Sequence, residues 1–128
     1  MTSTGAILIV DDDPALTAAF EAVLRNAGYA ALSATSAGQA LLILANSKIN
    51  AVITDLRMPE TNGLTLLAQI KAAGMNVPSI LLTGAGEFTH ADARASGVSA
   101  FLTKPIGSGE LVRVLAAVLA QNNHAAQR

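Results

Sequence analysis

Five short apolar runs recur along the chain, with longer amphipathic segments between them. The most apolar of these runs do not alternate between apolar and polar positions. Continuous apolar runs of this length are typical of parallel strands that are covered on both faces, so we predict a sheet sandwiched between helices. The predicted strands are Ala6 to Val10, Ala30 to Ala34, Ala51 to Thr54, Ser79 to Thr83 and Ala100 to Thr103.

The segments between these runs have the spacing of helices. A helix that begins at Asp13 and stops at Gly28 places Leu16, Phe20 and Leu24 on one face, at the steps of three and four residues that an amphipathic helix requires. Similar stripes predict the other covers of the sheet. These helices are expected over Ala37 to Ala45, Gly63 to Ala73, Glu87 to Ser96, and around the stripe from Leu111 to Leu119.

This alternation of strands and helices predicts one α/β domain, because parallel strands are joined by right-handed crossovers through helices. The length of 128 residues fits a single domain. If the strand order is 2-1-3-4-5, the sheet is doubly wound and the chain reverses direction beside the first strand. We expect residues 1–121 to form the domain and residues 122–128 to form a flexible C-terminal tail.

Composition and charge exclude several classes of function. The net charge is −1, and three Phe, one Tyr and no Trp provide neither a basic field nor a stacking platform, so we expect no nucleic-acid binding by this chain. Cysteine is absent, which excludes disulfides and thiolate metal sites. The segment MTSTG has no basic region, so we expect no secretory signal, and every apolar run falls short of the roughly 18 residues that a membrane-spanning helix needs. We therefore expect no membrane partner and a cytoplasmic location.

Polar side chains collect where the predicted strands end. Asp11 and Asp12 follow the first strand, Asp55 follows the third, Thr83 closes the fourth and Lys104 follows the fifth. In a parallel sheet all these positions lie along the carboxyl edge, where open α/β sheets bind their ligands. The strand order 2-1-3-4-5 would bring the carboxylates together at the reversal.

Each of these residues also has an ordinary structural interpretation. Asp13, just before Pro14, is most simply a helix N-cap. Asp11 and Asp12 could be a solvated acidic cluster, yet neighbouring carboxylates repel one another and a divalent cation would relieve that repulsion. Three converging carboxylates suit Mg²⁺, which prefers oxygen ligands. Thr83 and Lys104 alone would be a strand-end threonine and a surface lysine.

Together these residues form a set suited to phosphoryl transfer onto Asp55. Carboxylates serve as covalent acceptors of phosphate, and a metal ion with Lys104 would neutralise the charge on the transferred group. No phosphate-cradling glycine motif is present, which disfavours nucleotide binding. His90 and His124 are isolated, which disfavours a catalytic histidine or a zinc site.

The segments ILIVDDDP, VITDLRMPETNG, ILLTGAG and AFLTKP, in this order and spacing, resemble the response-regulator receiver domains of two-component signalling. The resemblance spans residues 6 to about 120. It implies a flavodoxin-like (βα)5 fold with strand order 2-1-3-4-5. It also implies that Asp55 accepts phosphate from a phosphohistidine of a sensor histidine kinase or phosphotransferase, and that the domain catalyses only its own phosphorylation and dephosphorylation.

The same resemblance assigns roles around Asp55. Asp12 and Asp55 would bind Mg²⁺ directly, together with the backbone carbonyl of Arg57, while Asp11 would act chiefly through water. Lys104 would pair with the phosphoryl group. The residue after it, Pro105, is expected to follow a cis peptide bond, as in similar domains.

The resemblance further implies a switch. Thr83 would turn toward the phosphate and Phe101 would swing inward, which is a population shift between two packings. The surface of the fourth helix, fifth strand and fifth helix would transmit this shift to a partner or to a second copy in a homodimer. Phe101 lacks the hydroxyl of the tyrosine often found at this position, so a signal that needs that hydroxyl is not expected here.

Arg57 and the segment LLTGAGE resemble the nitrogen-fixation and nitrogen-regulation branches of these regulators, and a side chain at position 57 would border the phosphate and tune its lifetime. Two alternatives remain at this point. One is a receiver used only for docking, without phosphorylation. The other is a phosphohydrolase of the haloacid dehalogenase type, with Asp11 as nucleophile and Asp13 as acid, although Ala15 stands where that motif has Thr or Val and only Glu110 is acidic after residue 104.

Overall fold

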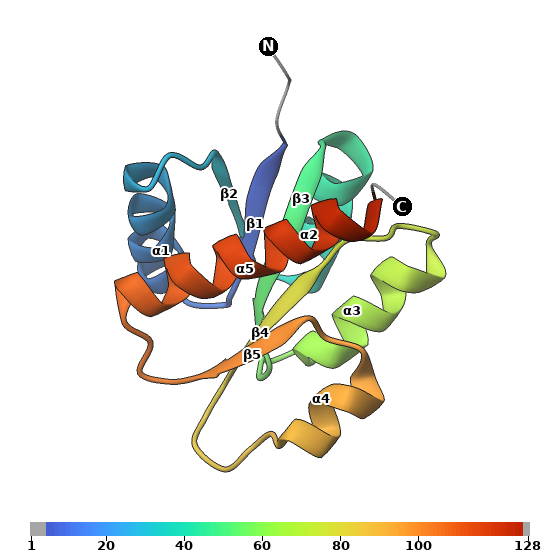
Figure 1. The fold of residues 1–128 in the computed structure, drawn as a ribbon. Helices are drawn as coiled ribbons and strands as arrows, with labels where there is room; N and C mark the ends of the chain where they lie inside the picture. The colour runs from blue at the N-terminus through green and yellow to red at the C-terminus, as the bar shows by residue number, and fades with distance from the viewer. Residues whose placement is uncertain (1–4, 127–128) are drawn as a thin grey trace.

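The structure is a computed structural model that describes residues 5–126, with the side chains of residues 5–121. Five strands and five helices alternate along this part of the chain (Figure 1). The strands are β1 (Ala6–Val10), β2 (Ala31–Ala34), β3 (Ile49–Asp55), β4 (Ser79–Thr83) and β5 (Ala100–Thr103). The helices are α1 (Pro14–Asn26), α2 (Ala37–Asn46), α3 (Gly63–Ala72), α4 (His90–Ser96) and α5 (Ser108–Ala126).

The strands form one parallel sheet with the order β2-β1-β3-β4-β5, which confirms the predicted topology. The chain passes from β1 to one neighbour, β2, and then returns to the other, β3. The carboxyl ends of β1 and β3 therefore lie side by side at the reversal. In the register of the sheet Asp55 pairs with Leu82 and Thr83 pairs with Thr103.

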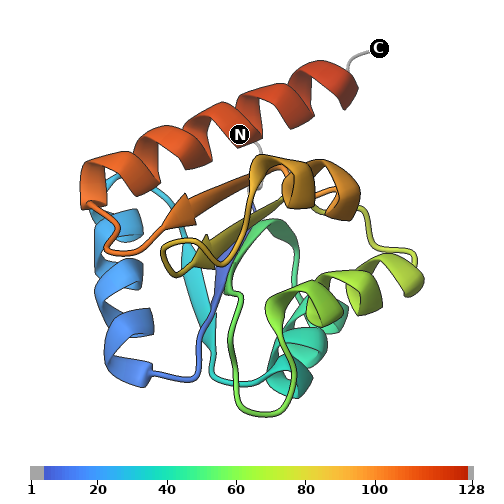
Figure 2. The same cartoon turned by 90° about the horizontal axis from the view of Figure 1, so that it is seen from below.

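Helices cover both faces of the sheet, as its apolar strands predict (Figure 2). Helices α1 and α5 pack on one face and α2 and α3 on the other, with α4 beside the β4 and β5 side. Fully buried Ile, Leu and Val side chains fill both layers, so the sheet is a rigid platform for what lies at its edge. The layer between the sheet and helices α1 and α5 includes Ile9, Leu24, Ile53, Leu111 and Leu115, and the layer between the sheet and helices α2 and α3 includes Leu8, Val52 and Leu66.

Several boundaries differ from the prediction by a few residues, and two of these differences bear on the site. Strand β3 includes Asp55 as its last residue, so this carboxylate belongs to the sheet. Helix α4 begins at His90 rather than at Glu87, because Thr89 accepts a hydrogen bond from the Asp92 amide while the Asp92 carboxylate accepts one from the Thr89 amide. None of the seven α4 residues is fully buried.

Helix α5 continues to Ala126, through most of the segment predicted as a flexible tail. Residues 1–4 and 127–128 lie outside the described residues, and the division into a domain and a tail stays a prediction. Within the part of the chain that the structure describes, no helix combines the length and the apolar character needed to cross a membrane.

Candidate functional site

The backbone around Asp55 is held from both sides. The Leu56 amide donates to the Leu82 carbonyl at 2.9 Å, and the Gly63 amide donates to the Leu56 carbonyl at 2.8 Å. A Cβ atom on Gly63 would lie 2.4 Å from the Asp55 carbonyl oxygen, so only glycine lets α3 begin this close to β3. Asp55 is thereby fixed at the edge of the sheet with its side chain 10% exposed.

Three carboxylates meet at this edge. Asp11, Asp12 and Asp55 each offer an oxygen atom that lies within 4.8 Å of the others. Asp11 and Asp55 are buried, whereas Asp12 is exposed. Like charges at this separation repel one another, and burial weakens the screening by water. The proximity of the three carboxylates confirms the prediction from the sequence that these acids converge.

Asp11 is the member of the cluster with an unsatisfied oxygen. Its Oδ1 atom accepts a hydrogen bond from the Asp13 amide at 2.9 Å, while its buried Oδ2 atom has no hydrogen-bond partner among the described residues. Burial raises the pKa of Asp11; the hydrogen bond from the Asp13 amide opposes this shift and the charge of Asp55 adds to it. A buried carboxylate oxygen without a donor suits a cation, so the cluster is compatible with a bound metal ion.

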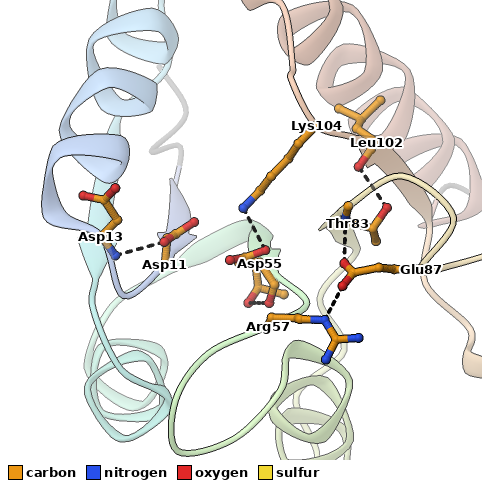
Figure 3. Close-up of polar contacts among 10 residues, drawn as sticks. Asp11, Asp13, Asp55, Arg57, Thr83, Glu87, Leu102 and Lys104 are labelled. Atoms are coloured by element: carbon orange, nitrogen blue, oxygen red, sulfur yellow. Dashed lines mark hydrogen bonds and ion pairs between the residues drawn. The ribbon is translucent and has the colours of Figure 1, made fainter.

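Lys104 places a positive charge directly beside Asp55. Its Nζ atom lies 3.1 Å from Asp55 Oδ1, as Figure 3 shows. Its amide donates to the Thr83 carbonyl at 2.8 Å, which ties the end of β5 to the end of β4. The peptide bond between Lys104 and Pro105 is cis, as the resemblance implied.

Thr83 and Phe101 lie on the neighbouring strands β4 and β5. The buried Thr83 hydroxyl donates a long hydrogen bond, 3.4 Å, to the Leu102 carbonyl, and Figure 3 shows it directed toward β5 rather than toward Asp55. The half-buried ring of Phe101 packs edge-on against Phe88 and His90, with ring centroids 5.1 Å and 5.2 Å away. The Thr83 hydroxyl thus has its partner in the backbone of β5, while the Phe101 ring has its partners at the start of α4 and in the loop before it.

Glu87 is a residue of this site that the sequence reasoning missed, since it was placed inside the fourth helix. It lies in the β4–α4 loop, where its carboxylate forms an ion pair with Arg57 and accepts a hydrogen bond from the Gly84 amide at 2.7 Å (Figure 3). The hydrogen bond from Arg57 and then that from the Gly84 amide lower the pKa of Glu87. The only signal in the sequence was an acid three residues after a glycine that follows a strand.

The remaining predicted residues have structural roles or lie apart. The Asp13 carboxylate accepts from the Ala15 amide at 3.0 Å and is the N-cap of α1. His90 lies on α4, and the side chain of His124 lies outside the described residues. Beside the acids is a hollow of about 460 Å³ that opens to solvent, lined by Asp12, Leu56, Arg57, Met58, Pro59 and Asn62.

Comparison with known proteins gives a consistent result. A family model for the response regulator receiver domain matches residues 7–116. The chain is 37% identical over 117 residues to the transcriptional regulatory protein GlrR of Escherichia coli, covering 91% of this chain and 26% of that protein. It is 30% identical over 128 residues to the transcriptional regulatory protein FixJ of Bradyrhizobium diazoefficiens, covering 99% of this chain and 62% of that protein. The chain thus spans about a quarter of the one relative and less than two thirds of the other.

Solved structures agree with the fold. The crystal structure of FixJ-N superposes with a TM-score of 0.83 at 26% identity, covering 93% of this chain and 96% of that one. A response regulator receiver protein from Pseudomonas putida superposes with a TM-score of 0.81 at 32% identity, covering 91% of this chain and 99% of that one.

Proposed function

The chain belongs to the response regulator receiver domain family of two-component signal transduction, and on this basis we propose that Asp55 is its phosphoacceptor. The phosphodonor is a phosphohistidine on a sensor histidine kinase or a histidine phosphotransferase. The observation that supports this proposal best is the buried Asp55 carboxylate, which lies beside two further acids and within 3.1 Å of the Lys104 ammonium.

In the transfer, a carboxylate oxygen of Asp55 attacks phosphorus while the bond from phosphorus to the histidine nitrogen breaks. The electron pair of that bond stays on the imidazole nitrogen, and the product is an acyl phosphate on Asp55. Lys104 pairs with Oδ1 of Asp55 before the transfer, and afterwards it holds a phosphoryl oxygen. The positive charge of Lys104 therefore stabilises the Asp55 carboxylate before the transfer and the phosphoryl group after it.

Asp11, Asp12, Asp55 and the backbone carbonyl of Arg57 are the groups that would hold Mg²⁺ in this site. When bound, Mg²⁺ would supply positive charge that offsets the negative charge of the phosphoryl group. The unpartnered Oδ2 atom of Asp11 and the mutual approach of the acids support this assignment. The chain itself orients Asp55, through the close approach of Gly63 to its carbonyl.

Thr83 and Phe101 are the switch residues of the proposal. The Thr83 hydroxyl exchanges its long hydrogen bond to the Leu102 carbonyl for one to a phosphoryl oxygen, and Phe101 moves inward into the space released. This shifts the population of packings at α4, β5 and α5, and that face then binds an output partner or a second copy of the domain. We assign the domain to the cytoplasm, with no nucleic-acid or membrane partner.

The two alternatives are less well supported. A haloacid dehalogenase type hydrolase would need Asp13 as an acid, but this side chain is engaged as the α1 N-cap. A receiver that only docks would not need a buried, unpartnered carboxylate oxygen beside Asp55.

The test is phosphorylation by a small phosphodonor. With Mg²⁺ and acetyl phosphate, the intact protein should gain one phosphoryl group by mass spectrometry, and Asp55→Asn should gain none. Asp13→Asn is the matched control, since it changes a nearby aspartate that caps α1 and should leave phosphorylation unchanged. A phosphoryl group on the Asp55→Asn variant would show that the nucleophile is another residue.

A second measurement separates docking from phosphorylation. Beryllofluoride, a phosphoryl mimic, should shift the amide signals of Thr83 and Phe101 in nuclear magnetic resonance (NMR) spectra recorded with saturating Mg²⁺. An unchanged spectrum would favour the receiver that only docks.

A further inference from the structure

The Glu87 carboxylate makes two charge-assisted contacts at once beside the proposed phosphorylation site. One oxygen forms the ion pair with Arg57 Nε, and the other accepts from the Gly84 amide at 2.7 Å (Figure 3). The Glu87 side chain is 25% exposed, although its partner Arg57 is 75% exposed. This carboxylate is therefore more firmly held than one in an ordinary surface ion pair, whose two side chains both extend into water.

The loop is shaped to bring this carboxylate onto the Gly84 amide. A Cβ atom on Gly84 would lie 2.9 Å from Glu87 Oε1, so any other residue at position 84 would crowd the contact. The Glu87 amide donates to the Gly84 carbonyl at 3.1 Å, and Gly86 between them has a φ of 78°, which glycine adopts readily. Two glycines thus favour a tight turn that ends on the acid.

The two partners of Glu87 come from the two strand ends beside Asp55. Arg57 follows Asp55 by two residues, and Gly84 directly follows Thr83 on the neighbouring strand. We propose that Glu87 is a positioning residue that acts as an internal anion, competing with the phosphoryl group on Asp55 for the Arg57 guanidinium and the Gly84 amide. This inference rests on the proposed function of Asp55.

The competition follows from charge. A phosphoryl group carries between about −1.5 and −2 charges at neutral pH, so it attracts donors more strongly than one carboxylate does. Each donor that turns toward it must leave Glu87, and the carboxylate then loses the contacts that hold the β4–α4 loop. Glu87 therefore weakens the binding of the phosphoryl group. It also couples phosphorylation of Asp55 to release of the loop that precedes α4.

The experiment measures the dissociation constant of beryllofluoride in saturating Mg²⁺, from the intensities of amide signals in NMR titrations. Glu87→Gln should bind about threefold to tenfold more tightly than the wild type, the range expected when one charged competitor is removed. Glu60→Gln is the matched control, because it removes one exposed carboxylate from the loop before α3 and should change the constant less than twofold. In an Arg57→Gln background, the gain from Glu87→Gln should shrink, because one of the two contested donors is gone.

A second readout follows the contact itself. The Arg57 Nε–H signal should be protected from exchange with water in the free wild type, and should lose this protection both in Glu87→Gln and on addition of beryllofluoride to the wild type. Protection that persists in the beryllofluoride state would overturn the competition, as would equal or weaker binding by Glu87→Gln. Wild-type protein that fails to bind beryllofluoride at all would overturn the proposed function, and this inference with it.

Discussion

Replacing Asp11 by Asn should stabilise the metal-free protein, although it removes a residue of the candidate metal site. Asp11 is buried with one oxygen unpartnered, and burial raises its pKa. A carboxyl group whose pKa is raised by folding destabilises the folded state at any pH where it is ionised. Asn keeps the oxygen that accepts from the Asp13 amide and removes the charge.

The magnitude follows from the separation of the acids. Two unit charges 4.8 Å apart repel by about 3 kcal/mol at an effective dielectric constant of 20. The Lys104 ammonium beside Asp55 and the exposure of Asp12 reduce this value, so we expect a net gain of about 1 to 2 kcal/mol. For a domain of this size, that raises the melting temperature by roughly 3 to 10 °C.

The assay is thermal unfolding followed by circular dichroism, in EDTA and again in Mg²⁺. The wild type should gain about 2.7 kcal/mol from Mg²⁺ at a concentration one hundred times the dissociation constant, whereas Asp11→Asn should lose most of this gain. In EDTA, the advantage of the variant should shrink as the pH falls through the raised pKa of Asp11, because the wild-type carboxyl group is then neutral as well. Glu60→Gln, an exposed change of the same charge, should reproduce neither effect.

The reasoning would be refuted if Asp11→Asn were less stable than the wild type in EDTA at neutral pH. Equal stabilisation of both proteins by Mg²⁺ would show instead that Asp11 takes no part in the metal site.

Two further substitutions test the geometry of the site. Gly63→Ala should destabilise the fold by about 1 to 3 kcal/mol in urea unfolding, because its Cβ would lie 2.4 Å from the Asp55 carbonyl oxygen. The control is Gly38→Ala in α2, whose Cβ would meet no atom within 4 Å, so this change should be neutral or stabilising. Equal effects of the two substitutions would contradict the close approach of Gly63 to Asp55. Thr83→Ala should still be phosphorylated by acetyl phosphate but should show a smaller beryllofluoride-induced shift of the Phe101 amide, and an undiminished shift would show that the hydroxyl does not transmit the signal.

The parts of the fold that follow from local pattern were predictable. Apolar runs such as Ala6–Val10 and Ser79–Thr83 became strands, because residues covered on both faces leave an uninterrupted hydrophobic signal. The convergence of Asp11, Asp12 and Asp55 followed from strand order alone, since the carboxyl ends of parallel strands share one edge.

The parts that depend on competition between local contacts were not predictable. Glu87 favours a helix by its intrinsic propensity, but the capping box of Thr89 and Asp92 starts α4 later and leaves Glu87 to the loop. The contact between the Glu87 carboxylate and the Gly84 amide depends on the backbone turn at Gly86, and no sequence motif signals that turn. The direction of the Thr83 hydroxyl likewise depends on the Leu102 carbonyl of the next strand.

Helix α4 contributes no fully buried side chain, in contrast to the fully buried leucines and isoleucines that anchor the other layers. The free energy needed to open a segment grows with the apolar contacts that it loses, so this helix can unfold or shift at a cost well below that of global unfolding. We therefore expect an unequal distribution of local stability, with slow hydrogen exchange in the core and faster exchange in the seven residues of α4. On the proposed function, a charge gained at the edge of the sheet would rearrange that helix while the five strands keep their pairing.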